Sequence, residues 1–160
     1  MDVRAAVEAD VDHLTQIWYD GWHEAHAQIV PAELRPFRTV DSFRQRLHAA
    51  LPNIRVAGPF GAPHGFSILK DAELYQLYVS APFRGSGIAA ALIDDAEARL
   101  SEHGISAAWL ACAVGNNRAA RFYEKRGWHR VGTIVYDAQT STGTFPLDVW
   151  RYEKVLGTDS

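Results

Sequence analysis

One segment constrains the fold more than any other: a largely apolar strand leads through a glycine-containing loop into a long helix. Residues 73–79 are mostly aromatic and aliphatic, which is typical of a strand buried on both faces of a sheet. From Gly87 the apolar residues follow a helical period that closes at Gly104. The pattern therefore predicts an inner strand, a tight loop at its end, and a helix packed against the sheet.

The segments around this unit predict further short strands and helices. Strands are expected at 3–6, 53–57, 65–69, 106–114, 131–136 and 145–155, and helices at 11–26, 39–51 and 116–127. We expect the last two strands to form a hairpin joined by the segment 140–144, which is rich in Ser, Thr and Gly. This order predicts an α/β (α+β) fold, with a mixed, mostly antiparallel central sheet of about seven strands flanked by four helices.

Length, composition and charge limit the class of protein. The chain has 160 residues, of which 48% are hydrophobic, and its formal net charge is −3. We expect one domain over residues 1–160, with a disordered tail at 157–160. No general basic field exists to attract nucleic acid or anionic lipid, so we expect neither nucleic acid nor membrane as a partner. Any anion site must be local.

Cysteine usage and the hydropathy pattern favour a cytoplasmic protein. Cys112 is the single cysteine, which rules out an intrachain disulfide and a multi-cysteine zinc site. The first residues show no signal-peptide pattern, and the longest apolar stretch, near 88–93, is too short to span a bilayer. Cys112 also lies in an apolar strand without an adjacent base, so we do not expect an acyl-cysteine route.

The loop at 82–89 predicts an anion site. Its backbone N–H groups stand at a helix N-terminus, where the helix dipole favours negative charge. Gly85 and Gly87 allow positive φ and close approach of a phosphate, and Arg84 adds a charge beside them. A bare Gly-x-Gly is more often only a turn. Its position between a buried strand and a long helix favours the phosphate interpretation here.

Residues 85–90 also fit the dinucleotide pattern Gly-x-Gly-x-x-Gly/Ala, with acidic Glu102 about 17 residues downstream. An NAD(P)-dependent oxidoreductase is therefore an alternative. A Rossmann fold would open its sheet with this unit and continue with helix-separated strands. Hairpin-like strands precede and follow the unit here, which disfavours the dinucleotide fold.

Two linked motifs resemble the GNAT superfamily of N-acetyltransferases. Residues 77–89 resemble its acyl-CoA-binding motif, and residues 116–128 are similar to its second signature. The resemblance covers 73–128, about a third of the chain. It implies a GNAT-like fold with splayed central strands, and direct transfer of an acetyl group from acetyl-CoA to a primary amine of a small molecule or peptide in a ternary complex. A noncatalytic acyl-CoA-binding sensor on the same scaffold is the second alternative.

The resemblance implies where acetyl-CoA, the expected cosubstrate, would bind. The backbone of one short strand segment would pair with the pantetheine arm, and Asn116 would hydrogen-bond the same arm. The strand segment comprises Leu77, Tyr78 and Val79, and the pyrophosphate would be held by Arg84, Gly85, Ser86, Gly87, Ile88 and Ala89.

The resemblance also implies that Tyr123 directs its hydroxyl at the sulfur. A departing thiolate needs a proton, and a tyrosine with a reference pKa of ~10 can donate one and remain protonated at pH 7. Tyr123 lies two helical turns after Asn116, which places both beside the same cleft. Without the motif, a tyrosine in a Phe-Tyr pair is more often part of the core. We expect Tyr123 to be the catalytic acid.

The base is expected at Glu73. Alternation of strand side chains would put Glu73 on the same face as Tyr75, Leu77 and Val79, toward the cleft. The alternatives are that a histidine or ordered water is the base and that Glu73 is a solvated residue at a hairpin turn. A glutamate with a reference pKa of ~4.3 would need burial to become an efficient base.

The acceptor site is expected beside the first helix, with Trp22, His23, His26 and Tyr75 as its walls. His23 and His26 lie one helical turn apart, but no third ligand is apparent, so we expect no metal. Core packing of the tryptophans is the alternative. Exposed edges of the C-terminal hairpin make a homodimer possible.

Overall fold

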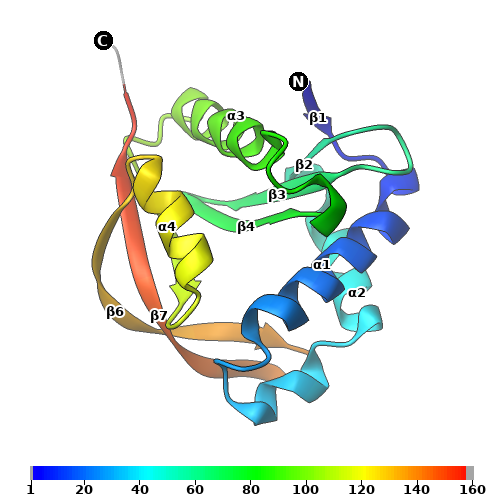
Figure 1. The fold of residues 1–160 in the computed structure, drawn as a ribbon, viewed down its shortest axis with the longest axis vertical. Helices are drawn as coiled ribbons and strands as arrows, with labels where there is room; N and C mark the ends of the chain where they lie inside the picture. The colour runs from blue at the N-terminus through cyan, green and yellow to red at the C-terminus, as the bar shows by residue number, and fades with distance from the viewer. Residues whose placement is uncertain (1, 158–160) are drawn as a thin grey trace.

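The structure, a computed structural model, describes residues 2–157 and is organised around one seven-stranded sheet (Figure 1). The strands are β1 (Val3–Ala5), β2 (Ile54–Ala57), β3 (Gly65–Lys70), β4 (Glu73–Val79), β5 (Ala107–Ala113), β6 (His129–Thr140) and β7 (Gly143–Val155). Their spatial order is β1-β2-β3-β4-β5-β7-β6, and only β4 and β5 pair in parallel. The predicted mixed, mostly antiparallel sheet is confirmed. Of the predicted tail, residues 158–160 lie outside the described range.

Four α-helices and four short 3-10 helices complete the described part of the chain. The α-helices are α1 (Val11–His26), α2 (Val40–Ala50), α3 (Ile88–Glu102) and α4 (Asn117–Lys125); the 3-10 helices are η1 (Glu8–Asp10), η2 (Ala32–Phe37), η3 (Leu51–Asn53) and η4 (Ala81–Phe83). In Figure 1, α1 and α2 lie together on one side of β4, and α3 and α4 lie on the other. Three clusters of buried apolar residues lie between the helices and the sheet in the described part of the chain.

The core under α1 and α2 is aromatic. The Trp18 ring centroid lies 4.9 Å from that of Phe43 and 5.8 Å from that of Phe66. Helix α1 approaches β4 through Gly21, where a Cβ atom would lie 2.5 Å from Cδ1 of Tyr78. Gly21 thus lets the Tyr78 ring fill the space between helix and strand. The second core, under α3 and α4, contains Ile93 and Trp128.

A β-bulge in β4 changes which side chains share a face. Gln76 pairs with Ile68 of β3, but Leu74 pairs with Leu69, so Tyr75 is an extra residue in the strand. The extra residue shifts the alternation by one position, and Tyr75 and Tyr78 both pack with the core under α1.

The expectation that Glu73, Tyr75, Leu77 and Val79 share one face is therefore wrong. Leu77 and Val79 pack instead with residues of α3. The bulge could not be recognised in the sequence, because it depends on how β4 pairs with β3.

The predicted splaying of the central strands is confirmed. Glu73 and Trp109 form the one registered pair between β4 and β5, next to a hydrogen bond that the Trp109 N–H donates to the Ala72 carbonyl at 3.1 Å. Beyond this point the two strands diverge toward their C-terminal ends. The divergence interrupts the sheet at the end of β4 from which the loop at 82–89 starts.

The predicted hairpin connection within 140–144 is confirmed, and the turn itself is shorter than this segment. Strand β6 continues to Thr140 and β7 begins at Gly143, and these two residues pair across a two-residue turn. Gly143 has φ +139°, a positive value that glycine adopts more easily than other residues. Threonine is a good strand former, so both strands extend into this segment. The long β6–β7 hairpin reaches around the bottom of the molecule toward η2 (Figure 1).

Candidate active site

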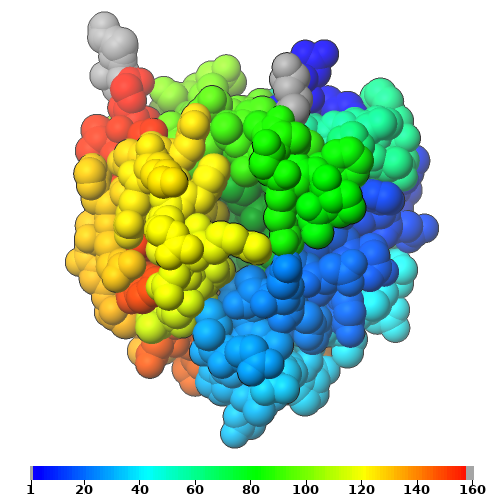
Figure 2. Space-filling view, in the orientation of Figure 1, coloured from blue at the N-terminus to red at the C-terminus, as the bar shows by residue number. Residues whose placement is uncertain are grey.

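The gap between β4 and β5 opens into a cavity of about 540 Å³, which is within the usual range for small-molecule sites. Its walls come from α1, α2, β4, the loop between β4 and α3, β5, α4 and the β6–β7 hairpin. Figure 2 shows this face hollowed between the green β4–α3 region and the yellow α4. The cavity has two ends, one at the β4–α3 loop and one beside α1 and α2.

The β4–α3 loop has the backbone conformation that the sequence predicts. Gly85 has φ +79° and Gly87 has φ +89°, and a Cβ atom built on either would meet open space. Gly87 occupies the N-cap position of α3, and no side chain caps that helix end. Its first-turn N–H groups are therefore available to an anion. The loop fits a phosphate in conformation, space and dipole direction.

The side chains of this loop contribute less than its backbone. The Ser86 hydroxyl donates to the Phe83 carbonyl, and Ile88 is buried in the core. The Arg84 guanidinium donates to both carboxylate oxygens of Glu24 on α1, at 2.5 and 3.1 Å. A guanidinium nitrogen of Arg118 on α4 lies 3.7 Å from the same carboxylate. Arg84 is thus already paired, and its hydrogen bonds hold the Glu24 pKa below its ordinary value.

The edge of β4 that faces the gap is open to pairing. The Ser80 N–H donates to the His64 carbonyl at 2.8 Å, on the β3 side. Because backbone groups alternate between the two sides of a strand, those of Leu77 and Val79 face the gap. Beyond Glu73, no residue of β5 is registered as a pairing partner for these backbone groups. An extended chain with amide groups could add to this edge as a strand.

Tyr123 and Asn116 both line the cavity from the α4 side, as expected from their spacing. The Asn116 side chain accepts a hydrogen bond from the Ala119 N–H at 3.4 Å and so caps α4. Burial, with Cys112 and Tyr78 nearby, raises the pKa of Tyr123 far above its ordinary value. The Tyr123 hydroxyl therefore keeps its proton at neutral pH and can act as a donor.

Glu73 is buried, with 5% of its surface exposed, so it is not a solvated turn residue. Its carboxylate accepts a hydrogen bond from the Tyr136 hydroxyl at 2.8 Å. Burial raises the Glu73 pKa, and the Tyr136 hydrogen bond opposes this rise. Tyr136 comes from β6, 63 residues away in sequence, and no sequence pattern connected it with Glu73. Both residues line the cavity.

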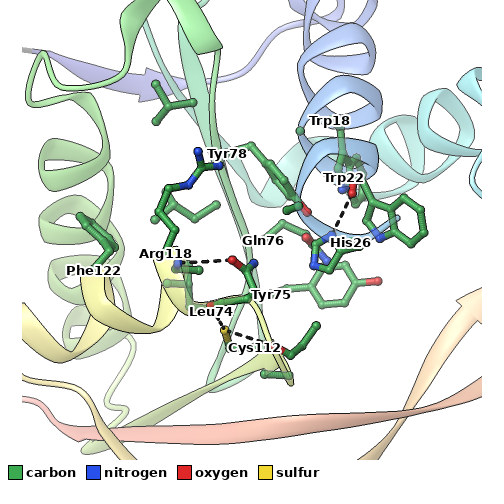
Figure 3. A pocket seen from close by; sticks show the side chains of 18 of the residues that line it. Trp18, Trp22, His26, Leu74, Tyr75, Gln76, Tyr78, Cys112, Arg118 and Phe122 are labelled. Carbon is green, nitrogen blue, oxygen red and sulfur yellow. Dashed lines mark hydrogen bonds between the residues drawn. The ribbon is translucent and has the colours of Figure 1, made fainter. Parts of the chain in front are cut away.

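Three of the four expected acceptor residues line the cavity: Trp22, His26 and Tyr75. Figure 3 shows the aromatic side chains of β4 directed toward Trp18 and Trp22 on α1. The His26 Nδ1 forms a 3.1 Å hydrogen bond with the Trp22 carbonyl, and burial lowers the His26 pKa to about 4. His26 is therefore neutral at pH 7.

The fourth expected acceptor residue, His23, lies outside the cavity wall. His23 does not line the cavity, because its Nε2 forms a 2.8 Å hydrogen bond with the Arg38 carbonyl. His23 follows Trp22 directly on α1, and this difference of one helical position directs its side chain to the segment at Arg38 rather than to the cavity. Sequence reasoning missed two cavity residues that this region brings in, Arg38 and Arg46.

Within residues 2–157, no group of three His, Cys, Asp or Glu side chains is arranged to bind a metal ion. Helices of the described chain are also too short or too polar to cross a membrane. Strand β6 forms an edge of the sheet and exposes Val131 and Val135; the homodimer stays a prediction.

Comparison with known proteins gives a consistent family. Residues 59–128 match the Acetyltransferase (GNAT) family. An uncharacterized N-acetyltransferase of Mycobacterium tuberculosis is 39% identical over 67 residues, which are 42% of this chain and 43% of the relative. The chain thus spans less than half the length of that relative in the alignment. The family match at 59–128 includes the β4–α3 loop and α4.

The fold is shared over nearly the whole chain. A GCN5-related N-acetyltransferase of Rhodopseudomonas palustris superposes with a TM-score of 0.75 at 21% identity, covering 97% of this chain and 95% of that one. An N-acetyltransferase of Thermoplasma acidophilum, solved in complex with coenzyme A, gives a TM-score of 0.65 at 21% identity, covering 96% and 98%. At this identity the likeness shows the fold alone. A sheet with one parallel pair is not a Rossmann fold, which removes the basis for the dinucleotide alternative.

Proposed function

We propose that this chain is a member of the GNAT family of acetyltransferases and that it transfers the acetyl group of acetyl-CoA directly to a primary amine of a small molecule or peptide in a ternary complex. The observation that carries the proposal is the split between β4 and β5, which joins a phosphate-fitting loop and an open strand edge to one cavity. Acetyl-CoA would supply the activated acetyl group. Backbone N–H groups of residues 85–89 would bind its pyrophosphate, and the β4 edge would bind its pantetheine arm.

Tyr123 is the proton donor of the proposed reaction. Tyr123 lines the cavity from α4, and its raised pKa keeps the hydroxyl protonated. A protonated hydroxyl beside the leaving sulfur is the arrangement that general acid catalysis needs. Asn116, which uses its side-chain oxygen to cap α4, has its amide N–H groups left to orient the cosubstrate.

Glu73, with Tyr136 bonded to it, is the proposed proton acceptor, directly or through an ordered water. Its raised pKa makes it a stronger base than an exposed glutamate. His26 is the weaker candidate, because a pKa of about 4 leaves it with little affinity for a proton. Burial raises the pKa of Cys112 to about 12, so its thiol stays protonated, which favours direct transfer over an acyl-cysteine intermediate.

Two measurements test this proposal. Acetyl-CoA should raise the melting temperature of the full chain, while NAD and NADP should not, because a ligand that binds the native state stabilises it. A screen of primary amines, following release of free thiol from acetyl-CoA, should then find acceptors. Stabilisation without thiol release for any amine would support the sensor alternative. The absence of any acetyl-CoA effect would contradict the binding site itself.

A further inference from the structure

Two arginines line the α1–α2 end of the cavity although neither belongs to a motif. Arg38 lies between η2 and α2 and is 4% exposed, and Arg46 is a half-buried residue of α2. Both contribute to the wall that also contains Trp18 and Trp22. Arginines are seldom buried unless an anion accompanies them.

Neither guanidinium is neutralised by a carboxylate. Among the described residues, the ion pairs of this protein involve other basic side chains, and no acidic side chain lies within 4.0 Å of Arg38 or Arg46. Glu73 shares the cavity, but its carboxylate is bonded by Tyr136 and its pKa is shifted toward the neutral form. The two positive charges therefore have no protein counterion at this end of the cavity.

Their hydrogen bonds are also incomplete. Arg38 donates from Nη1 to the Gln139 carbonyl at 2.7 Å, and Arg46 donates from Nη2 to the Tyr75 hydroxyl at 2.8 Å. The buried Nε of Arg38, and the buried Nε and Nη1 of Arg46, have no partner among the described residues. A guanidinium has five N–H donors, and leaving buried ones unpaired is unfavourable.

Aromatic rings offset only part of this charge. The Arg46 guanidinium lies 4.3 Å from the Trp18 ring centroid, and that of Arg38 lies 5.8 Å from the Trp22 ring centroid. Ring faces attract a cation but leave its in-plane N–H groups without acceptors. Burial and the charge of Arg46 together lower the Arg38 pKa to about 10, which still leaves Arg38 cationic at pH 7.

We propose that the acceptor of this enzyme is an amine that also carries a carboxylate, and that Arg38 and Arg46 bind this carboxylate. The inference rests on the proposed function and names the substrate class of the same cavity. A carboxylate supplies the two missing features together, a negative charge and oxygen acceptors for the guanidinium N–H groups. The amine end would then extend toward Glu73, which lines the same cavity.

This assignment predicts a discrimination that can be measured. The carboxamide of an acceptor has nearly the same shape but no charge, so it would leave the two arginines unneutralised. Sites built to pair a polar group discriminate strongly against analogues that lack it. Free amino acids and ω-amino acids should therefore be preferred over their amides and over simple alkylamines.

The first test measures binding without requiring turnover. The full chain, saturated with coenzyme A, is titrated calorimetrically with L-amino acids and ω-amino acids, each matched with its carboxamide. We expect at least one carboxylate to bind about tenfold or more tightly than its amide. Equal binding within every pair, tighter binding of the amides, or no binding of any carboxylate would overturn the inference.

The second test locates the binding group. Arg46→Gln should bring the ratio of the amide KM to the carboxylate KM toward one and leave the affinity for acetyl-CoA unchanged. Arg46→Lys, which retains the charge, should restore part of the ratio. Arg44→Gln is the matched control, because Arg44 lies on the same helix with an exposed partner on either side, Asp12 and Asp41. An unchanged ratio in Arg46→Gln would show that Arg46 only packs in the wall.

The two proposals can fail separately. Acetylation of amines without preference for a carboxylate would overturn this inference and leave the acetyltransferase proposal intact. Carboxylate-selective binding without thiol release for any amine would overturn the proposed transfer and support a carboxylate site in a noncatalytic protein.

Discussion

The two ends of the cavity are built in different ways. At the β4–α3 loop the functional groups are mostly backbone N–H and C=O groups from the contiguous segments 77–89 and 116–128. At the α1–α2 end they are side chains from distant segments, and the Arg38–Gln139 hydrogen bond joins residues that are 101 positions apart. A contiguous backbone site keeps a recognisable sequence pattern, whereas a site of distant side chains does not.

The charges of the two ends also differ. Near the loop, Arg84 and Arg118 share the partly exposed carboxylate of Glu24. At the α1–α2 end, Arg38 and Arg46 have no carboxylate partner among the described residues, and Glu73 is buried with Tyr136. Solvent screens the first group of charges, but it screens the second much less. Substitutions of charged residues should therefore have small electrostatic effects at the β4–α3 loop and large ones at the α1–α2 end.

The largest effect is expected at Tyr123, which lines the cavity from α4. Tyr123→Phe keeps the ring packing and removes the hydroxyl, so turnover should fall by ~10² or more while the KM for acetyl-CoA changes little. Steady-state kinetics with a working acceptor measures both quantities. Tyr19→Phe, on α1 and outside the cavity wall, is the control and should be near wild type. Wild-type turnover in Tyr123→Phe would show that Tyr123 only packs.

The next largest effect tests whether the loop binds through its backbone. Gly87→Val should weaken acetyl-CoA binding by about tenfold or more, because loss of one charge-assisted hydrogen bond has roughly this effect. The matched control is Gly104→Val at the other end of α3, where φ is +82° against +89° and the space is equally open. Because both variants introduce the same backbone strain, the difference between their acetyl-CoA affinities, measured by calorimetry, reports the loss of binding at Gly87 alone. Equal affinities in the two variants would place the phosphate elsewhere.

Glu73→Gln tests the proposed base through two measurements, turnover and the affinity for acetyl-CoA. Turnover should fall by about tenfold or more, with the greatest loss at the low end of the active pH range, where unprotonated amine is scarcest. The affinity for acetyl-CoA should remain nearly unchanged. Glu102→Gln, at the exposed end of α3, should alter neither quantity. An unaltered pH–rate profile in Glu73→Gln would transfer the role of base to water or His26.

The same variant should be more stable than the wild type at pH 8. The folded-state pKa of Glu73 is raised, so its stabilising contribution is present below its unfolded pKa and is lost as pH rises through the folded pKa. Removing the buried charge should raise the melting temperature by about 2 °C or more at pH 8. The difference should vanish at pH 3. A lower melting temperature at pH 8 would mean that Tyr136 compensates fully for burial.

The smallest effect is expected from Glu24→Gln, which frees Arg84 and Arg118 at the loop. Acetyl-CoA should bind about two- to threefold more tightly at low ionic strength, and the gain should disappear in high salt. Glu33→Gln, an exposed residue of η2, is the control. Weaker acetyl-CoA binding in Glu24→Gln would indicate that Glu24 positions Arg84 for the cosubstrate rather than competing with it.

The sequence by itself determined the strand–loop–helix unit and the element order, and its two motifs carry the resemblance to the GNAT family. The positive φ of Gly85 and Gly87 and the positions of Tyr123 and Asn116 on one helix face followed from rules that act within a few residues. Steric limits on φ and the helical period are local, so they can be recognised without knowing the rest of the fold.

Only the tertiary structure decided the α1–α2 end of the cavity. The bulge at Tyr75, which separates Leu77 from the tyrosines of β4, arises from the pairing of β4 with β3. Arg46 meets Tyr75 across 29 positions, and Tyr136 meets Glu73 across 63. Such contacts depend on strand register and on where a hairpin folds back. One shifted residue reverses the face of every side chain that follows, so local sequence patterns do not contain these contacts.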